Sequence, residues 1–152
     1  TLAAFLQRLG HRLLGDDATI LDAPGEHVLA SATYQSLRLL PDSVSALFGD
    51  TGRAEPIAHY TAKLRVGAER STVARGPLPC RALFTLAPPP QEDGSIACRR
   101  VEPASACMDL VRESFALDPT DTERASLRLQ LAGRVANLLP AFELTYPRDY
   151  ER

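Results

Sequence analysis

The sequence predicts an α/β fold in which a mixed sheet is flanked by helices. Stretches with apolar residues at helical spacing alternate along the chain with short runs of strand-forming residues, and proline and glycine separate them. The chain has 152 residues, of which 45% are hydrophobic and 24% charged, enough for one ordinary core. We therefore expect a single domain spanning residues 1–152.

The first element is predicted to be a helix at residues 1–9. Leu2, Phe5, Leu6 and Leu9 fall on the spacing of one helix face, and Gly10 stands where a C-terminal glycine would end the helix. The sequence starts with a threonine and is in helical rhythm from its first residue. We therefore expect a further segment upstream.

Short strands are expected next, around two adjacent carboxylates, Asp16 and Asp17. The four predicted strands are HRLL (11–14), ATILDA (18–23), HVLAS (27–31) and YQSLRLL (34–40). In the last of them, Leu37 and Leu39 should lie on one face and Arg38 on the other.

The middle of the chain combines one short helix with a loop-rich segment. PDSVSALFG (41–49) has a proline in its first turn and a glycine past its end, which is typical of a short helix. Residues 50–79 carry five basic and three acidic side chains, with proline and glycine scattered among them. We expect loops there, a turn at the GDTG of residues 49–52, and one strand at AKLRV (62–66).

The last part of the chain alternates strands and helices. Strands are expected at 80–87, 97–102 and 141–146, a solvated loop at 88–95, and a helix at 103–115. Thr120 and Glu123 form a T-x-x-E capping box ahead of a helix at 124–139. The apolar residues expected on one side of this helix are Leu127, Leu131, Val135 and Leu138.

Overall charge and cysteine content exclude several classes of function. The 17 Lys and Arg against 19 Asp and Glu give a net charge of −2, which offers no electrostatic footprint for nucleic acid or an anionic membrane. No apolar run is long enough to span a membrane, and no secretory signal is visible. Cys80, Cys98 and Cys107 lack metal-ligand spacing, and we expect them to be small core residues. A cytoplasmic protein is predicted.

Asp16 and Asp17 are the first candidates for chemistry. Burying two adjacent like charges is costly, so their place within an apolar stretch needs an explanation. Adjacent side chains of an extended segment point to opposite faces, so the two carboxylates should have different tasks. One could bind a divalent cation while the other accepts a hydroxyl proton, as in phosphoryl transfer. The alternative is a turn in which Gly15 and both carboxylates are exposed.

Lys63 and Arg65 are the second candidates. Lys63 is the sole lysine of the sequence, and both residues lie in the locally basic segment, where a cation could fold over an anionic ligand. The alternative is a solvated strand edge. The three histidines, His11, His27 and His59, lack a partner at informative spacing and are interpreted as surface or helix-cap residues.

The run TLAAFLQRLGHRLLGDDATILD (1–22) resembles the segment after the phosphate-binding loop of HPr kinase/phosphorylases and the smaller HPr-kinase-like serine kinases. In that family the loop ends in Gly-Lys-Ser, a helix follows, and a Gly-x-Arg-Leu stretch leads to an Asp-Asp pair. Gly10, Arg12, Leu13, Asp16 and Asp17 match in type and spacing. The later runs LRLLPDSVSAL, KLR, LPCRALFTL and FELTYPRD also look like the small-kinase pattern, so the resemblance covers nearly the whole chain.

The resemblance implies a P-loop, HPr-kinase-like fold, of which residues 1–152 are the C-terminal part starting just after the expected P-loop. It implies an ATP- and Mg²⁺-dependent serine kinase that phosphorylates a protein or peptide and assembles as a homo-oligomer. Asp16 and Asp17 would then be both the catalytic and the metal-binding residues, one of them the proton acceptor. Lys63 and Arg65 would close over the nucleotide phosphates.

The sequence departs from this family in one respect, because no G-x-x-x-x-G-K-[ST] motif occurs in it. Two expectations follow. Either the sequence is part of a longer kinase, or the protein is a non-catalytic binding or scaffold relative that has lost the nucleotide-binding loop.

Overall fold

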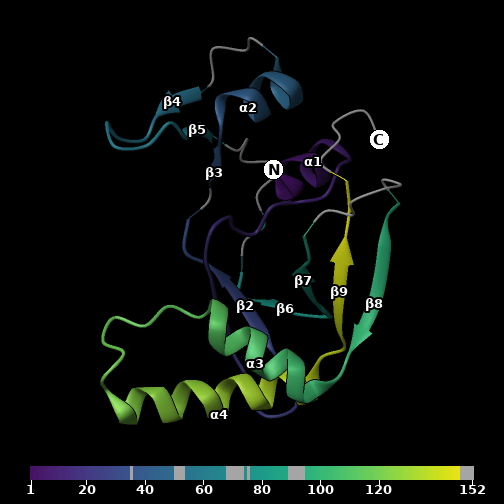
Figure 1. Cartoon of the computed structure of the whole chain (residues 1–152), viewed down its shortest axis with the longest axis vertical. Coiled ribbons are helices and arrows are strands. Elements are labelled where there is room, and N and C mark those ends of the chain that lie inside the picture. Colours follow the sequence, from purple (N-terminus) through teal and green to yellow (C-terminus); the bar gives the residue numbers. More distant parts are fainter. Residues whose placement is uncertain (35, 50–53, 68–73, 75, 89–94, 148–152) are drawn as a thin grey trace. The chain divides into compact units, whose positions relative to one another are not determined.

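The computed structural model describes residues 1–34, 36–49, 54–67, 74, 76–88 and 95–147. Within these ranges the fold is mixed α/β, with four helices and three small sheets (Figure 1). The described chain divides into two compact units, unit 1 (residues 1–21, 30–78) and unit 2 (residues 22–29, 79–147). The α/β class is confirmed, whereas the single domain stays a prediction.

Helix α1 (Leu2–Arg8) confirms the first predicted helix. Gly10 follows the C-cap with a φ of 93°, a backbone conformation that glycine adopts without a Cβ penalty. The Gly10 N–H donates to the Gln7 carbonyl at 3.0 Å, and the His11 N–H donates to the Leu6 carbonyl at 3.1 Å. This pair of bonds is the Schellman motif, and it satisfies two carbonyls that the helix end would otherwise leave unpaired.

Unit 1 is built on an antiparallel sheet of strand order β3-β5-β4, comprising β3 (Ser36–Leu39), β5 (Leu64–Gly67) and β4 (Ala54–Pro56). Helix α2 (Pro41–Phe48) follows β3 directly, with proline in its first turn and Gly49 at a φ of 63° after its end, as predicted. Leu37 and Leu39 are 1% and 2% exposed, and they form one core with Ala4 of α1 and Leu47 of α2. The alternation predicted around Arg38 is therefore confirmed.

A second small sheet has the order β1-β2-β6, with β1 (Thr19–Asp22), β2 (Leu29–Ala32) and β6 (Leu78–Pro79). The chain passes from one unit to the other within each of these strands. The strand predicted at residues 11–14 is wrong, because only Leu13 makes an isolated bridge. The Leu13 carbonyl accepts a hydrogen bond from the Ala74 N–H at 2.8 Å.

Unit 2 holds a mixed sheet of order β7-β9-β8, whose strands are β7 (Leu83–Leu86), β9 (Ala141–Thr145) and β8 (Ala97–Val101). Strand β9 pairs parallel with β7 and antiparallel with β8. Helices α3 (Pro103–Glu113) and α4 (Thr122–Leu138) pack on each other. Ala106, Ala136 and Ala141 join α3, α4 and β9 in one small core.

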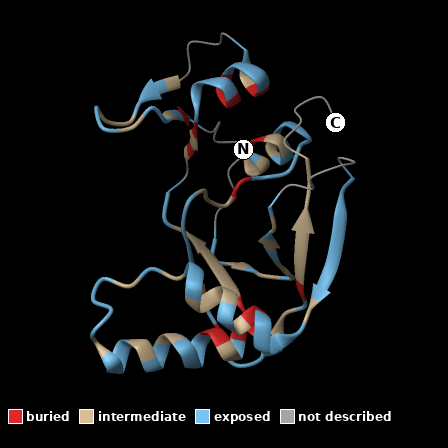
Figure 2. Cartoon of the chain, viewed as in Figure 1, coloured by how far each residue is buried: buried red, intermediate tan, exposed pale blue. Residues whose placement is uncertain are grey.

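Helix α4 differs from the sequence prediction in its N-cap residue and in how much of its apolar side is buried. Its N-cap is Asp121, whose carboxylate accepts from the Arg124 N–H at 3.0 Å, so the predicted capping box at Thr120 and Glu123 is wrong. The Thr120 hydroxyl donates instead to Asp118 at 2.7 Å. Of the predicted apolar side, Val135 is 1% exposed and Leu138 is half-buried, whereas Leu127 and Leu131 are exposed. Burial is therefore confined to the second half of the helix (Figure 2).

The remaining expectations concern exposure and segments outside the described ranges. Cys98 is exposed, which contradicts its assignment to a core, while Cys80 and Cys107 are half-buried and all three thiols are free. The three histidines are exposed, as predicted. Residues 50–52 of GDTG, most of the loop at 88–95, and the last two residues of FELTYPRD lie outside the described residues. Within the described ranges, no helix combines the length and the apolar character needed to cross a membrane.

Candidate functional site

Asp16 and Asp17 occupy a bend in unit 1, between Leu13 and strand β1. The Ala18 N–H closes the bend on the Asp16 carbonyl at 2.7 Å, and Asp17 takes a φ of 68°. Aspartate is one of the few residue types that adopt this left-handed conformation readily. Asp16 is half-buried and the Asp17 side chain is 49% exposed. The local structure is therefore a turn, as in the alternative interpretation, but of the three residues expected to be exposed only Asp17 is, because Gly15 and Asp16 are half-buried.

Arg38 of strand β3 contacts both carboxylates. Its backbone N–H donates to Asp16 Oδ2 at 2.8 Å, and its guanidinium Nη1 donates to Asp17 Oδ2 at 2.9 Å. Asp16 therefore satisfies a backbone donor of a strand edge, whereas Asp17 forms an ion pair with a side chain that is 32% exposed. Such a half-exposed pair is worth about 0–1 kcal/mol. The two adjacent carboxylates have different partners.

The Arg38 guanidinium also contacts an aromatic ring, and Arg38 belongs to a row of charged residues on the sheet. Its Cζ lies 4.9 Å from the centroid of the Tyr34 ring, within the range of a cation–π contact. The Arg38 N–H donates to Asp16, so this backbone group points away from β5. Arg38 and Arg65, which lie opposite each other, are therefore a non-hydrogen-bonded pair of the antiparallel ladder. Arg65 also pairs with Glu55 of β4. Arg38, Arg65 and Glu55 thus form a row on the polar face of the sheet.

The structure separates the two basic candidates. Arg65 lies directly across from Arg38, which contacts the carboxylates, so it belongs to the same polar face as the candidate site. Lys63 is an exposed residue just before β5, and its N–H donates to the Thr61 hydroxyl at 3.2 Å. Across the described part of the chain, no contact joins Lys63 to either carboxylate. Lys63 fits its alternative interpretation, a solvated position at the strand end.

The donor set of the bend is compatible with a magnesium ion that is also held by phosphates. Mg²⁺ commonly uses one or two carboxylates, together with water and substrate phosphates, rather than a cage made wholly of protein ligands. Asp16 and Asp17 supply two carboxylates at most. The described residues contain no group of three or more His, Cys, Asp or Glu side chains that could hold a metal ion without such help.

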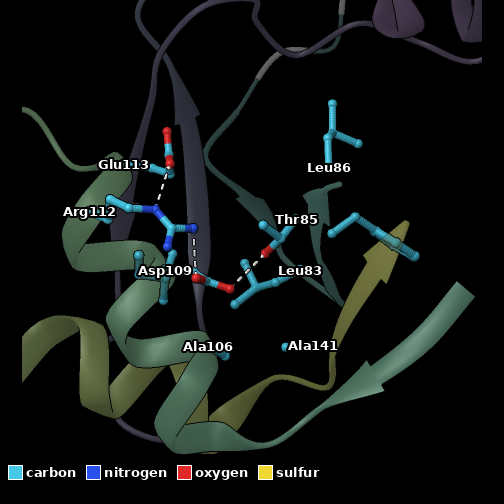
Figure 3. A pocket seen from close by; sticks show the side chains of 10 residues that line it. Leu83, Thr85, Leu86, Ala106, Asp109, Arg112, Glu113 and Ala141 are labelled. Carbon is cyan, nitrogen blue, oxygen red and sulfur yellow. Dashed lines mark hydrogen bonds and ion pairs between the residues drawn. The ribbon is translucent and has the colours of Figure 1, made fainter. Parts of the chain in front are cut away.

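Unit 2 contains a separate cavity of about 400 Å³, between β7 and α3 (Figure 3). Its polar side is a chain of contacts: the Thr85 hydroxyl lies 3.4 Å from Asp109 Oδ2, and Arg112 donates to Asp109 at 2.8 Å and to Glu113 at 3.2 Å. The hydrogen bond to Glu113 and the charge of Asp109 raise the pKa of Arg112 above its ordinary value. The remaining lining is mainly aliphatic, from residues such as Leu83, Leu110 and Ala141.

Sequence reasoning missed the part of Arg38 and Tyr34 in the site. The period-2 pattern correctly placed Arg38 on the polar face of its strand, but no spacing rule relates a strand residue to a bend 22 positions earlier. The available signal was weaker, namely an arginine on a short strand after an acidic turn.

Comparison of the chain with family models, with curated proteins and with solved structures finds no match.

Proposed function

We propose that this chain carries the carboxylate pair of an ATP- and Mg²⁺-dependent serine kinase of the HPr-kinase-like type. The observation that carries the proposal is the convergence of Asp16 and Asp17 on Arg38, at a solvent-accessible bend. The sequence resemblance over residues 1–22 supplies the class of reaction. Two adjacent carboxylates with different partners suit a reaction in which they perform different tasks.

In the proposed reaction, the serine hydroxyl oxygen of a protein or peptide forms a bond to the γ-phosphorus of ATP. The bond between that phosphorus and the β,γ-bridging oxygen breaks, and ADP leaves. One carboxylate of the pair accepts the hydroxyl proton, and the other contributes to holding Mg²⁺. When bound, Mg²⁺ would neutralise charge on the transferring phosphoryl group.

Arg65 is the basic residue best suited to contact the nucleotide phosphates in this proposal. It is exposed, and it lies across from Arg38 on the polar face of the β3-β5-β4 sheet. Its planar guanidinium can donate two parallel hydrogen bonds to phosphate oxygens. Lys63, the other basic candidate of the sequence, lies just before the same strand and is exposed, and it has a weaker claim to a phosphate contact.

A specific observation favours a second candidate, a non-catalytic binding or scaffold module. The Oδ2 atoms of Asp16 and Asp17 both accept hydrogen bonds from Arg38, so the pair already has a structural task in tying the bend to β3. In this alternative the carboxylates stabilise the turn, and Mg²⁺ and ATP have no part.

Phosphoryl transfer from γ-labelled ATP separates the two candidates. The protein is expressed from its complete reading frame and incubated with Mg²⁺ and a degenerate library of serine-containing peptides. The kinase proposal predicts Mg²⁺-dependent labelling of serine, which is confirmed by phosphoamino-acid analysis. Absence of labelling, with Mg·ATP showing no binding by calorimetry, would contradict the kinase proposal and support the scaffold.

A further inference from the structure

We propose that the open edge of strand β7 binds an extended peptide segment of a partner protein, in which a basic residue stands between apolar ones. The inference concerns unit 2 and is independent of the kinase proposal. In the sheet order β7-β9-β8, no described strand pairs with the other side of β7. The N–H groups of Leu83 and Ala87 donate to carbonyls just before and within β9, at 3.0 and 2.9 Å. Backbone direction alternates along a strand, so the N–H and C=O groups of Phe84 and Leu86 point to the open side.

The two edges of this sheet differ in their protection. Strand β8, at the opposite edge, carries two exposed arginines, Arg99 and Arg100. Exposed charges and prolines are common means by which soluble proteins keep sheet edges from pairing with other chains. Residues 83–86 of β7 read Leu-Phe-Thr-Leu and contain neither. The edge of β7 therefore lacks this protection and is suited to accept another strand.

The cavity of about 400 Å³ follows this edge (Figure 3). All four residues of β7 line it, although successive side chains of a strand point to opposite faces of the sheet. A cavity confined to one face would meet only alternate side chains, so this cavity extends around the backbone edge between β7 and α3. An added strand would pair with the outward groups of Phe84 and Leu86, and its side chains on one face would enter the cavity.

The cavity wall formed by α3 is acidic, which selects the chemistry of the occupant. Asp109 and Glu113 stand against the single guanidinium of Arg112, so this wall carries one excess negative charge. Asp109 Oδ2 has only a long contact, of 3.4 Å, with the Thr85 hydroxyl, and a carboxylate oxygen can accept two hydrogen bonds. A lysine or arginine side chain entering the cavity supplies the missing positive charge and packs its aliphatic stem against the apolar lining.

The opposite face of β7 selects apolar neighbours for this basic residue. Phe84 and Leu86 are 56% and 51% exposed there, and the Phe84 ring stacks on the ring of Phe142 in β9. Side chains of an added strand alternate between the two faces, so the residues flanking the basic one meet this apolar surface. A second copy of β7 does not fit, because Leu-Phe-Thr-Leu offers no charge to the acidic wall. The occupant is thus a different segment, in which apolar and basic residues alternate.

Peptide binding, measured by fluorescence anisotropy on the protein expressed from its complete reading frame, tests the inference. The probe is fluorescein-labelled Gly-Gly-Val-Lys-Val-Leu-Val-amide, which contains no serine and therefore reports binding separately from phosphoryl transfer. This lysine peptide should bind saturably, with a Kd on the order of 100 µM or tighter. A matched peptide with glutamate in place of lysine should bind at least ~10-fold more weakly, because it brings a like charge to the acidic wall.

Backbone methylation separates strand addition from side-chain docking. One derivative of the lysine peptide is N-methylated at its lysine and leucine, and the other at its second and third valines. Alternate residues of a paired strand direct their N–H groups to the same side, so only one derivative loses the donors that face β7. That derivative should bind at least ~10-fold more weakly, whereas the other should stay within about threefold of the parent peptide.

Two protein variants locate the site. Leu86→Pro removes an outward N–H and leaves the hydrogen bonds to β9, so it should weaken binding by at least ~10-fold. Asp109→Asn should weaken binding of the lysine peptide about fivefold. The matched control is Glu123→Gln, at an exposed position of α4 outside the cavity, which should stay within about twofold. Circular dichroism verifies folding, and the methylated peptides test the inference on the unaltered protein if Leu86→Pro does not fold.

Four results would overturn the inference: no saturable binding of the lysine peptide, equal affinity for the glutamate peptide, the same response to both methylation patterns, or full binding by folded Leu86→Pro. Sedimentation equilibrium supplies a fifth. A dimer that Leu86→Pro dissociates would assign the edge to a second copy of the chain instead of a partner peptide.

Discussion

At the residue scale, the conformation of Asp17 explains which substitutions can probe the carboxylate pair. Its φ of 68° is the single positive value among the described non-glycine residues. Alanine should cost about 1 kcal/mol more than asparagine here, because a Cβ without a local hydrogen-bonding group is disfavoured in the left-handed region. Urea unfolding of Asp17→Ala and Asp17→Asn measures this difference, and since both variants lose the carboxylate, equal stabilities would contradict the backbone explanation.

Asp118 gives a second residue-scale prediction, which concerns pH. The hydrogen bond from the Thr120 hydroxyl, followed by that from the Thr120 N–H, lowers the pKa of Asp118 below its ordinary value of 3.8. A lowered folded-state pKa adds stability that is complete above the ordinary value and is lost as pH falls through the lowered one. Thr120→Val removes the hydroxyl donor and should raise the Asp118 pKa, as measured by carboxyl-carbon NMR titration.

The residue scale also shows a limit of sequence reasoning. Apolar and polar alternation placed Leu37, Arg38 and Leu39 on their correct faces, because it depends only on neighbours along one strand. The contacts of Arg38 with Asp16 and Asp17 depend on how the bend docks on β3, which is a property of tertiary structure. The candidate acids were named from the sequence, but their cationic partner was not.

At the element scale, Gly15 sets how closely the acidic bend approaches the chain before β3. A Cβ built on Gly15 would lie 3.3 Å from the Tyr34 carbonyl oxygen and 3.6 Å from Ala32 Cα, both of them backbone atoms with little freedom to move. The contact with Ala32 is an ordinary one, but the Tyr34 carbonyl would have to move by a few tenths of an ångström, so Gly15→Ala should lower the free energy of unfolding by about 1 kcal/mol. Gly67→Ala is the matched control, because nothing lies within 4 Å of the added Cβ. Equal effects in urea unfolding would contradict the close approach.

Helix α4 gives a prediction about its two halves. Val135→Ala removes methyl groups from a side chain that is 1% exposed and should cost about 2 kcal/mol, whereas Leu127→Ala at 58% exposure should stay within about 0.5 kcal/mol. Thermal unfolding of both variants tests this difference. A large loss for Leu127→Ala would show that the first half of α4 is covered in solution.

Most helices and strands were predictable because their signals are local. Pro41 and Gly49 mark the ends of α2, and Gly10 ends α1 with its positive φ. The α4 N-cap was misassigned by one residue because Asp121 outcompetes Thr120, whose hydroxyl is already bonded to Asp118. Helical spacing also predicted one apolar side along the whole length of α4. It could not predict which part of that side is buried, because the spacing does not tell how far the neighbouring α3 extends along the helix.

At the scale of the whole molecule, the chain forms two compact units, each with its own core residues. Unit 1 contains the acidic bend, Arg38 and Arg65, and unit 2 contains the cavity between β7 and α3. The alternation of helical and strand patterns predicted the α/β class. Composition predicted one core and did not reveal the two units, because hydrophobic content does not report which buried side chains meet. The candidate site lies within unit 1 alone.

The proposed role of the carboxylates is tested most directly by comparing turnover with stability in Asp→Asn variants of the protein expressed from its complete reading frame. Asp17→Asn should lower kcat/KM for serine phosphorylation by at least ~100-fold. Its free energy of unfolding should fall by only about 1 kcal/mol, since asparagine tolerates the left-handed backbone and the lost ion pair is half-exposed. Asp22→Asn, at an exposed position of β1, should keep full activity. Full turnover in both Asp16→Asn and Asp17→Asn would contradict the assignment of the pair.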